Sequence, residues 1–343
     1  MCVWPGIMAD LAGASADAPL LALRRLKGDR TEWMFVGDYR RHAMHGTSIR
    51  HCPGRGISIV AMKPFASGAR VMSEEPLLTW TSAPGTKNEL ANLDALVGTL
   101  DAAHYADYHE LVDIWSGDGK GKTAAGIWNS NSFVIEDALA TGRAESIDGL
   151  HRAGVFRAIS RLNHDCHPNA FISWNGLLGV QTVHALRDIA AGEELTIAYV
   201  AGAEAGSRTQ RRRLLARKYR FVCKCATCRL EGAALIVSDR RHSRLAAIHR
   251  ALSADTSEEA AGAVEGGVLA LVEEQLDLMR AEGVPIILGK AGWILAIVRL
   301  QQAGDVPAAA AWAKTGVNAA RHALGADSSA HQCFSNLLAA VTS

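Results

Sequence analysis

The amino-acid sequence predicts an α+β protein in which a β-rich region is followed by an all-helical one. Short runs of β-branched and aromatic residues, bounded by turn-forming residues, occupy 56–76 and 170–200. Beyond Leu230 the composition shifts to alanine, leucine and charged residues in helical runs. A compact group of cysteines, in the run CKCATC at 223–228, lies between the two regions.

The first β-rich segment, 56–76, is predicted to form a β-hairpin. Two runs that contain β-branched residues are joined there by a turn with Pro64 and Gly68. Three further short strands are expected in AFISWN, LLGVQTVHAL and ELTIAYV, with asparagine and glycine residues between or before them.

The middle of the chain contains helical and glycine-rich segments. Residues 89–115 carry apolar side chains at three- and four-residue spacing and predict helical structure. In the glycine-rich run GDGKGKTAAGI, residues 117–123 are expected to form a flexible loop, because glycines cluster there and the spacing does not match a phosphate-binding loop. A later helix begins at Ser207, which is a suitable N-cap. Its three arginines, Arg211–Arg213, are expected on a solvated face rather than against an acidic partner.

Five helical runs make up the C-terminal region. Glycine and proline residues at 283–285 and 304–307 separate some of them. Short links between consecutive helices favour antiparallel pairs, packed as a bundle or a short solenoid. The predicted runs are 239–253, 264–281, 286–302, 308–324 and 330–341.

Composition limits the classes of function. The 343 residues allow about two domains, and 49% hydrophobic with 21% charged residues is ordinary for a globular protein. With 36 basic against 35 acidic residues, the chain has no overall positive field to hold a nucleic acid. It contains no run of about 20 apolar residues, so we expect no membrane span.

Cysteine usage predicts a reducing compartment, the cytoplasm or the nucleus. The chain has seven cysteines, and Cys2, Cys52 and Cys333 show no regular pairing. The apolar N-terminal segment lacks a basic region before it and is interrupted by proline and aspartate, which argues against a signal peptide.

The run CKCATC brings three cysteines, Cys223, Cys225 and Cys228, close enough to bind one metal ion. Zinc favours four tetrahedral ligands, and a site closed by four cysteines is structural because no position remains for water. The fold must therefore supply a fourth ligand, and Cys166 in RLNHDCHPNA is the candidate. By spacing alone Cys166 is a weak choice, and the alternative is a loop of reduced thiols.

Five separated segments resemble the SET-domain protein lysine methyltransferases, and more narrowly the SET and MYND-containing group and its relatives without the MYND finger. They stand in the family order. The segments are PGRGI at 53–57, NSNSF at 129–133, NHDCHPN at 163–169, GEELTIAY at 192–199 and CKCATC at 223–228.

The resemblance covers about residues 50–230 and implies a SET domain in which NHDCHPN and GEELTIAY thread past each other as a pseudo-knot. Asp165 stands where serine is commoner in the family, and no cysteine lies between Trp80 and Gly126, so the MYND finger is missing. The implied division is an N-terminal extension at 1–49, a SET domain at 50–205 with a helical insert at about 86–126, a post-SET zinc segment at 206–232 and a helical C-terminal domain at 233–343.

The resemblance also implies an activity, which is methyl transfer from S-adenosylmethionine to a lysine ε-amine of a histone or another protein. The implied cofactors are S-adenosylmethionine and one structural Zn²⁺. The implied partner is a lysine-containing protein or peptide, with no nucleic acid and no membrane, and we expect a monomer. Transfer from a sulfonium requires alignment and exclusion of water more than acid–base groups, and the sequence shows no paired carboxylates or nucleophilic triad.

By resemblance, two tyrosines lie at the reaction centre, and glycines near the cofactor remove the β-carbons that would obstruct it. The implied catalytic residues are Tyr199 and Tyr219. The implied cofactor-binding residues are Gly54, Arg55, Gly56, Asn163, His164, Tyr219 and Phe221. The implied substrate channel consists of Ser132, Phe133 and Tyr199, and the implied metal ligands are Cys166, Cys223, Cys225 and Cys228.

Two other functions compete with this interpretation. The first is an inactive SET-like scaffold that keeps the fold and the metal and binds a protein partner through its helical C-terminal domain. The presence of Tyr199, Tyr219, Asn163 and His164 together argues against it. The second is a nucleic-acid-binding zinc module, which the balanced charge and the lack of an adjacent recognition helix disfavour.

Overall fold

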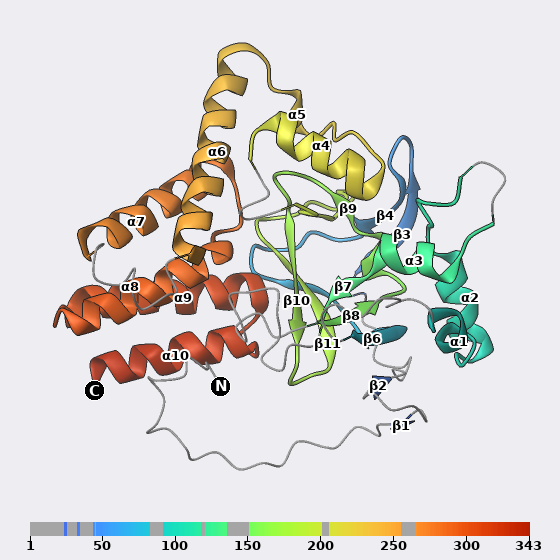
Figure 1. The fold of residues 1–343 in the computed structure, drawn as a ribbon, viewed down its shortest axis with the longest axis horizontal. Coiled ribbons are helices and arrows are strands. Elements are labelled where there is room, and N and C mark those ends of the chain that lie inside the picture. The colour runs from blue at the N-terminus through green and yellow to red at the C-terminus, as the bar shows by residue number, and fades with distance from the viewer. Residues whose placement is uncertain are drawn as a thin grey trace.

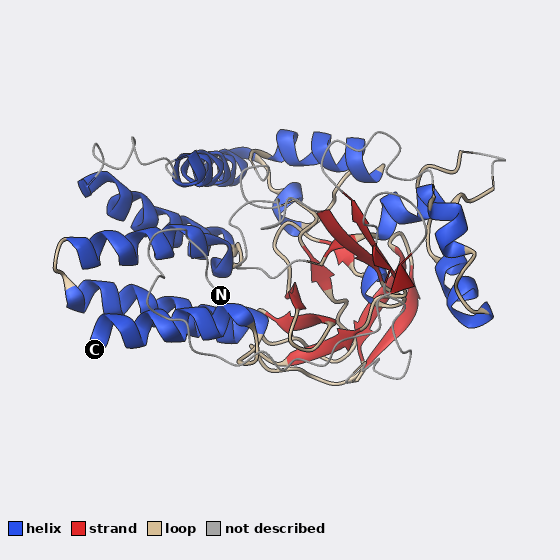
Figure 2. Cartoon of the chain, turned by 60° about the horizontal axis from the view of Figure 1, so that its bottom comes forward, coloured by secondary structure: helices blue, strands red, loops and turns tan. Residues whose placement is uncertain are grey.

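The computed structural model has the α+β architecture that the sequence predicts. A β-rich body lies beside a layer of C-terminal helices (Figures 1 and 2). The structure describes residues 24–25, 33–34, 44, 46–82, 92–117, 121–135, 151–200, 206–254 and 265–343. Most of the predicted N-terminal extension, the start of the helical insert and part of the glycine-rich loop lie outside the described residues.

The described strands form five small sheets. Two are antiparallel pairs, β1 (Arg24–Arg25) with β2 (Trp33–Met34) and β3 (Thr47–Cys52) with β4 (Gly56–Ala61). Two have three strands, in the order β10 (Ala170–Asn175), β11 (Val180–Ala185), β5 (Arg70–Glu74) and in the order β6 (Leu78–Ser82), β8 (His151–Val155), β7 (Phe133–Val134). The fifth is the parallel pair β9 (Asn163–His164) and β12 (Thr196–Ile197).

The hairpin predicted over 56–76 is wrong. Both strands exist, as β4 and β5, but β4 pairs with the preceding strand β3 and β5 pairs with β11. The tight turn lies before β4, where Gly54 and Gly56 both have φ of 73°, a conformation that favours glycine. After β4 the chain is tied to a distant segment instead, because Phe65 and Ile189 exchange backbone hydrogen bonds of 2.9 Å.

The helical insert consists of short helices rather than one long one. The predicted helix over 89–115 is divided into α1 (Leu93–Val97) and α2 (Ala102–Glu110), because Asp101 caps a new helix by accepting from the backbone N–H groups of Ala103 and His104. Helix α3 (Ala124–Asn131) follows and is capped by Thr123. Helix α3 thus begins directly after the predicted glycine-rich loop, 117–123.

The predicted C-terminal helices are confirmed, with bounds that differ by a few residues. Consecutive helices pack on one another, and Trp293 and Phe334 lie in their shared core with ring centroids 6.2 Å apart. The helices are α6 (Gly232–Ala254), α7 (Glu265–Glu282), the short 3₁₀ helix η5 (Ile286–Gly289) with α8 (Lys290–Gln302), α9 (Val306–Leu324) and α10 (Ser329–Thr342). Helix α4 (Arg208–Tyr219) begins after the N-cap Ser207, as predicted.

The C-terminal helices contact the β-rich body through polar groups as well as apolar ones. Helix α9 packs on β10 and β11, and next to this contact Asp327 forms an ion pair with Arg70. At a second place the ring of His167 lies against Gly283, which has φ of 60°. A Cβ atom on Gly283 would overlap this ring, so the close approach requires glycine.

Two expectations from composition are tested by the structure. In the part of the chain that the structure describes, no helix is long and apolar enough to cross a membrane. Cys52 is a free thiol. Cys333, which is buried on α10, is disulfide-bonded, although we expected no pairing for it.

We predict that Glu74→Ala destabilises the fold by about 2 kcal/mol, because it leaves buried N–H groups without an acceptor. The Glu74 carboxylate is 3% exposed and accepts from the backbone N–H groups of Ala158 and Ile159, at 2.8–3.1 Å. These residues begin η2 (Ile159–Arg161), which leads into β9. Urea unfolding measures the effect, with the exposed Glu273→Ala as the control. Equal stabilities of the two variants would contradict the prediction.

Candidate functional site

The segments NHDCHPN and GEELTIAY cross each other and are held together by hydrogen bonds. Their parallel pairing, β9 with β12, is extended by the Asp165 N–H, which donates to the Ile197 carbonyl at 3.0 Å. The Asn169 side chain, 2% exposed, accepts from the Thr196 N–H at 2.8 Å and donates to the Glu194 carbonyl at 2.8 Å. The crossing that the resemblance implies is therefore present and has a fixed register.

The Asn163 amide ties the Gly-Arg-Gly turn to this crossing. Its Nδ2 lies 3.2 Å from the Arg55 carbonyl, 2.8 Å from Ser58 Oγ and 2.9 Å from Glu194 Oε1. Arg55 Nε forms an ion pair of 2.7 Å with Glu194 Oε2, and its Nη2 donates to the His164 carbonyl at 3.3 Å. Residues 54–56, Asn163 and His164 are thus brought together at the crossing.

His164 connects the tyrosine at the end of GEELTIAY to the cysteines. The Tyr199 N–H donates to His164 Nδ1 at 3.0 Å, which leaves the imidazole proton on Nε2, 3.3 Å from Cys166 Sγ. Burial lowers the pKa of His164 to about 4, so the ring is neutral. The side chain of His164 is therefore a buried, hydrogen-bonded imidazole, and its backbone carbonyl is what faces Arg55.

Tyr199 lies within a group of aromatic rings. Its ring centroid is 4.8 Å from that of Tyr219 and 6.3 Å, edge-on, from that of Phe221. Its hydroxyl donates to the Leu162 carbonyl at 2.6 Å. Burial raises the pKa of Tyr199, and the neighbouring Tyr219 raises it further, so the phenol stays protonated at neutral pH.

The residue between Tyr219 and Phe221 is held by the helical insert. Arg220 has φ of 59°, and no other non-glycine residue in the described ranges has a positive φ. Its guanidinium lies over the Trp115 ring, 4.2 Å from the centroid, which is a cation–π contact. The insert thereby contacts the segment that carries the aromatic wall.

Ser132 and Phe133, predicted to line a substrate channel, lie at the end of α3 and the start of β7. Ser132 ends α3, and its N–H donates to the Trp128 carbonyl at 2.9 Å. The Phe133 ring packs near Phe156, with centroids 6.3 Å apart. Phe133 and Tyr199 border the same apolar core. The Tyr199 and Tyr219 rings pack against each other at a tilt, whereas Phe133 does not belong to that aromatic group.

The four predicted metal ligands come together from distant parts of the chain. Their Sγ atoms all lie within 4.8 Å of one another, and all four side chains are buried. Cys166 Sγ is 3.6 Å from Cys228 Sγ and 4.0 Å from Cys223 Sγ, compared with about 3.8 Å expected between the ligands of a tetrahedral zinc–thiolate site. All four are free thiols. The donor set and its spacing fit a structural Zn²⁺.

The thiols of this cluster influence one another's protonation. Hydrogen bonding to Cys166 lowers the pKa of Cys225 to about 5, whereas hydrogen bonds among the same group, together with burial, raise the pKa of Cys166. Asp165, one residue before Cys166, accepts from the His167 N–H at 2.8 Å. Asp165, which stands where serine is commoner in the family, therefore caps the loop locally, and the four cysteines still come together.

Two arginines of α4 support the cysteine cluster, which corrects the prediction of a solvated face for Arg211–Arg213. Arg212 donates from Nε to the Cys223 carbonyl at 3.0 Å and from Nη2 to the Cys228 carbonyl at 2.9 Å. Arg211 is 2% exposed, and only Arg213 is exposed. The three side chains point in different directions around the helix, as consecutive helical residues do.

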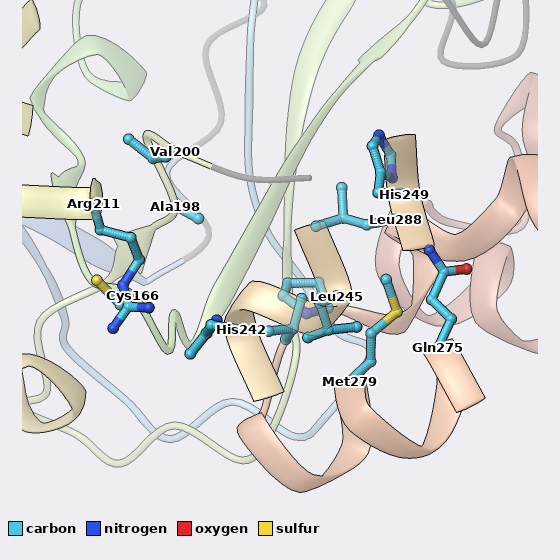
Figure 3. A pocket seen from close by; sticks show the side chains of 12 residues that line it. Cys166, Ala198, Val200, Arg211, His242, Leu245, His249, Gln275, Met279 and Leu288 are labelled. Atoms are coloured by element: carbon cyan, nitrogen blue, oxygen red, sulfur yellow. The ribbon is translucent and has the colours of Figure 1, made fainter. Parts of the chain in front are cut away.

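A small cavity lies between the cysteine cluster and the C-terminal helices. Its volume is about 30 Å³, which is room for about two water molecules. Figure 3 shows Arg211 next to Cys166 on one side and residues of α6 and α7 on the other. The lining includes Cys166, Ala198, Val200, Arg211, His242, Leu245, Gln275 and Met279.

Several residues that hold the site were not found from the sequence. Glu194 lies inside GEELTIAY, so closer attention to this motif could have found it. Ser58, Trp115 and Arg211 carry no local signal, because each acts on a residue far away in the chain.

Comparison with known proteins identifies the domain. Residues 56–200 match the SET domain family. The chain is 29% identical over 202 residues to the histone-lysine N-methyltransferase set5 of Schizosaccharomyces pombe, an alignment that covers 59% of this chain and 56% of that protein. It is 34% identical over 106 residues to the protein-lysine N-methyltransferase SMYD4 of Mus musculus, covering 29% and 13%.

A third relative is the human histone-lysine N-methyltransferase SMYD3, which is 41% identical over 80 residues, covering 23% of this chain and 17% of that protein. The alignments thus span at most 56% of these three relatives. The chain contains a SET domain and is homologous to lysine methyltransferases of the set5 and SMYD groups.

We predict that the purified protein carries about one zinc ion per chain. Cys228→Ser removes a buried ligand and should lower both the bound zinc and the melting temperature, because metal binding contributes to folding. Elemental analysis and thermal unfolding measure the two effects. Cys52→Ser, outside the cluster, is the control. A full complement of zinc in Cys228→Ser would contradict the four-cysteine site.

Proposed function

We propose that this SET domain transfers a methyl group from S-adenosylmethionine to the ε-amine of a lysine in a protein substrate. The observation that carries the proposal is the crossing of NHDCHPN and GEELTIAY, which brings the Gly-Arg-Gly turn, Asn163 and the Tyr199 aromatic group into one place. The activities in the names of the relatives support the reaction class.

S-adenosylmethionine, when bound, supplies a methyl group already activated by a cationic sulfur. The protein then has to orient a neutral amine and exclude water. A narrow aromatic channel suits this task, because desolvation lowers the pKa of a lysine ammonium. We assign the walls of the channel to Tyr199, Tyr219 and Phe133, with Ser132 at its edge.

Tyr199 would act as a hydrogen-bonding group rather than as a base. Its raised pKa keeps the hydroxyl protonated, and this proton is directed at the Leu162 carbonyl. The oxygen lone pairs remain to accept a hydrogen bond from the lysine amine and to polarise the methyl group that is transferred. Tyr219, stacked near Tyr199, presents a second hydroxyl and a ring face to the same channel.

The cofactor residues are assigned by their positions around the crossing. Gly54 and Gly56, on either side of Arg55, have no β-carbon to obstruct the cofactor. Apart from their chain neighbours, no atom of the described residues lies within 4 Å of a Cβ built on either glycine. Asn163 and the backbone of His164 would hold the cofactor from the opposite segment, and Phe221, with Tyr219 beside it, would stack on the adenine. Zinc on the four cysteines would fix the segment that carries Phe221.

The substrate class and the cellular location are assigned on the same grounds as the reaction. The names of the relatives include both histone and general protein substrates, so we assign a lysine-containing protein or peptide, handled by a monomer in the cytoplasm or the nucleus. The C-terminal helices, which pack against the β-rich body, would form one side of the substrate cleft. A scaffold without catalysis is the alternative that the experiments below distinguish.

We predict that Tyr199→Phe lowers methyl transfer by about 100-fold, the order of loss seen when one positioned hydrogen-bonding group is removed. Binding of S-adenosylmethionine should be unchanged, because the ring remains. Tritium transfer to histones and to a cell lysate measures the rate, and calorimetry measures binding. The exposed Tyr105→Phe is the control. Binding of the cofactor without transfer to any substrate pool by the unmodified protein would favour the scaffold.

We predict that Asn163→Ala weakens S-adenosylmethionine binding by about tenfold or more. The variant removes the amide that ties the Gly-Arg-Gly turn to the crossing, and about 1.4 kcal/mol corresponds to tenfold in affinity. Calorimetric titration measures the affinity. Asn336→Ala, at an exposed position on α10, serves as the matched control. Equal affinities of the two variants would remove Asn163 from the proposed site.

A further inference from the structure

Arg211 is a buried cation with unused hydrogen-bonding capacity. Its side chain is 2% exposed, and Nη1 donates to the Gly206 carbonyl at 2.6 Å. Nε and Nη2 are buried without a hydrogen-bond partner. Burying an unpaired charge is costly, and no other arginine or lysine in the described part of the chain is buried as deeply.

The position of Arg211 on its helix increases this cost. Arg211 lies in the first turns of α4, which begins at Arg208. The N-terminus of a helix carries a partial positive charge and favours anions. The helix therefore does not compensate the charge, and among the described residues Arg211 forms no ion pair with a carboxylate. A compensating negative charge must come from another group nearby.

The cysteine cluster lies next to Arg211 and would supply that charge. Arg211 and Cys166 line the same small cavity and lie next to each other in Figure 3. The donor set fits Zn²⁺, and a zinc ion with four thiolates carries two more negative than positive charges.

We propose that Arg211 is the buried counter-charge of the metal–thiolate centre. This inference rests on the proposed zinc site. Arg211 and Cys166 face the C-terminal helices across this cavity, because His242 of α6 and Met279 of α7 line its other side. A bound metal holds the thiolates in place beside this cation, so metal occupancy stabilises the packing of the helices against the SET domain.

The test compares Arg211→Met with the unmodified protein in the presence of zinc and after chelation. With zinc, the variant should melt at a lower temperature and release the metal to a chelator about tenfold faster, the order of effect of losing a group that supports metal ligands. After chelation the loss of stability should be smaller, because the metal that Arg211 helps to hold is then absent from both proteins. A purely structural arginine would give the same loss with and without zinc.

Three further variants separate charge from packing. Arg211→Lys keeps the charge and should restore most of the metal retention. Arg212→Met removes hydrogen bonds to the Cys223 and Cys228 carbonyls and should destabilise the protein with and without zinc. Arg213→Met, at an exposed position of the same helix, should change neither.

Particular outcomes overturn the proposal. Equal destabilisation by Arg211→Met with and without zinc, or zinc release at the unmodified rate, would make Arg211 a packing residue only. Absence of zinc from the unmodified protein would overturn both this inference and the metal site. Cofactor binding is measured separately and does not depend on the Arg211 comparison.

Discussion

The crossing of two loops is the constraint on which the rest of the site depends. Only two residues of each segment pair as strands, β9 with β12, and such a short parallel pair is not stable by itself. The buried Asn169 amide completes the crossing by binding the backbone of the second segment at the first residue of β12, Thr196, and just before it, at Glu194. Because the amide is enclosed, a shift of register would leave several polar groups without partners. The Gly-Arg-Gly turn and the aromatic group take their positions from this junction.

A continuous path of contacts leads from this junction to the metal centre. His164 belongs to β9, accepts from the Tyr199 backbone and places its other ring nitrogen against Cys166. The cysteines then hold the segment that carries Tyr219 and Phe221, and Arg212 holds the same segment from α4. The cysteine cluster, the crossing and the aromatic group are therefore connected in one assembly.

The sequence predicted best those features that depend on neighbouring residues. The C-terminal helices were found because their periodicity is local and because glycine and proline end the runs near Gly283 and Gly304. The predicted pairing of β4 with β5 was wrong, because strand partners are determined by packing between segments that lie far apart in the sequence. The buried Arg211 was missed for the same reason. The three cysteines of CKCATC were found from their local spacing, whereas the choice of Cys166 as the fourth ligand depended on family resemblance. The roles assigned to Tyr199 and Asn163 remain predictions.

The contact of His167 with Gly283 has a mechanical consequence. His167 belongs to the loop that carries Cys166, and Gly283 ends α7, so the imidazole occupies the space that a side chain would otherwise take. If the C-terminal helices moved away from the SET domain, the His167 ring would have to separate from Gly283. Movement of the helices and loosening of the loop that carries Cys166 are therefore coupled, so the docking of the helical layer depends on the same loop as the cysteine cluster.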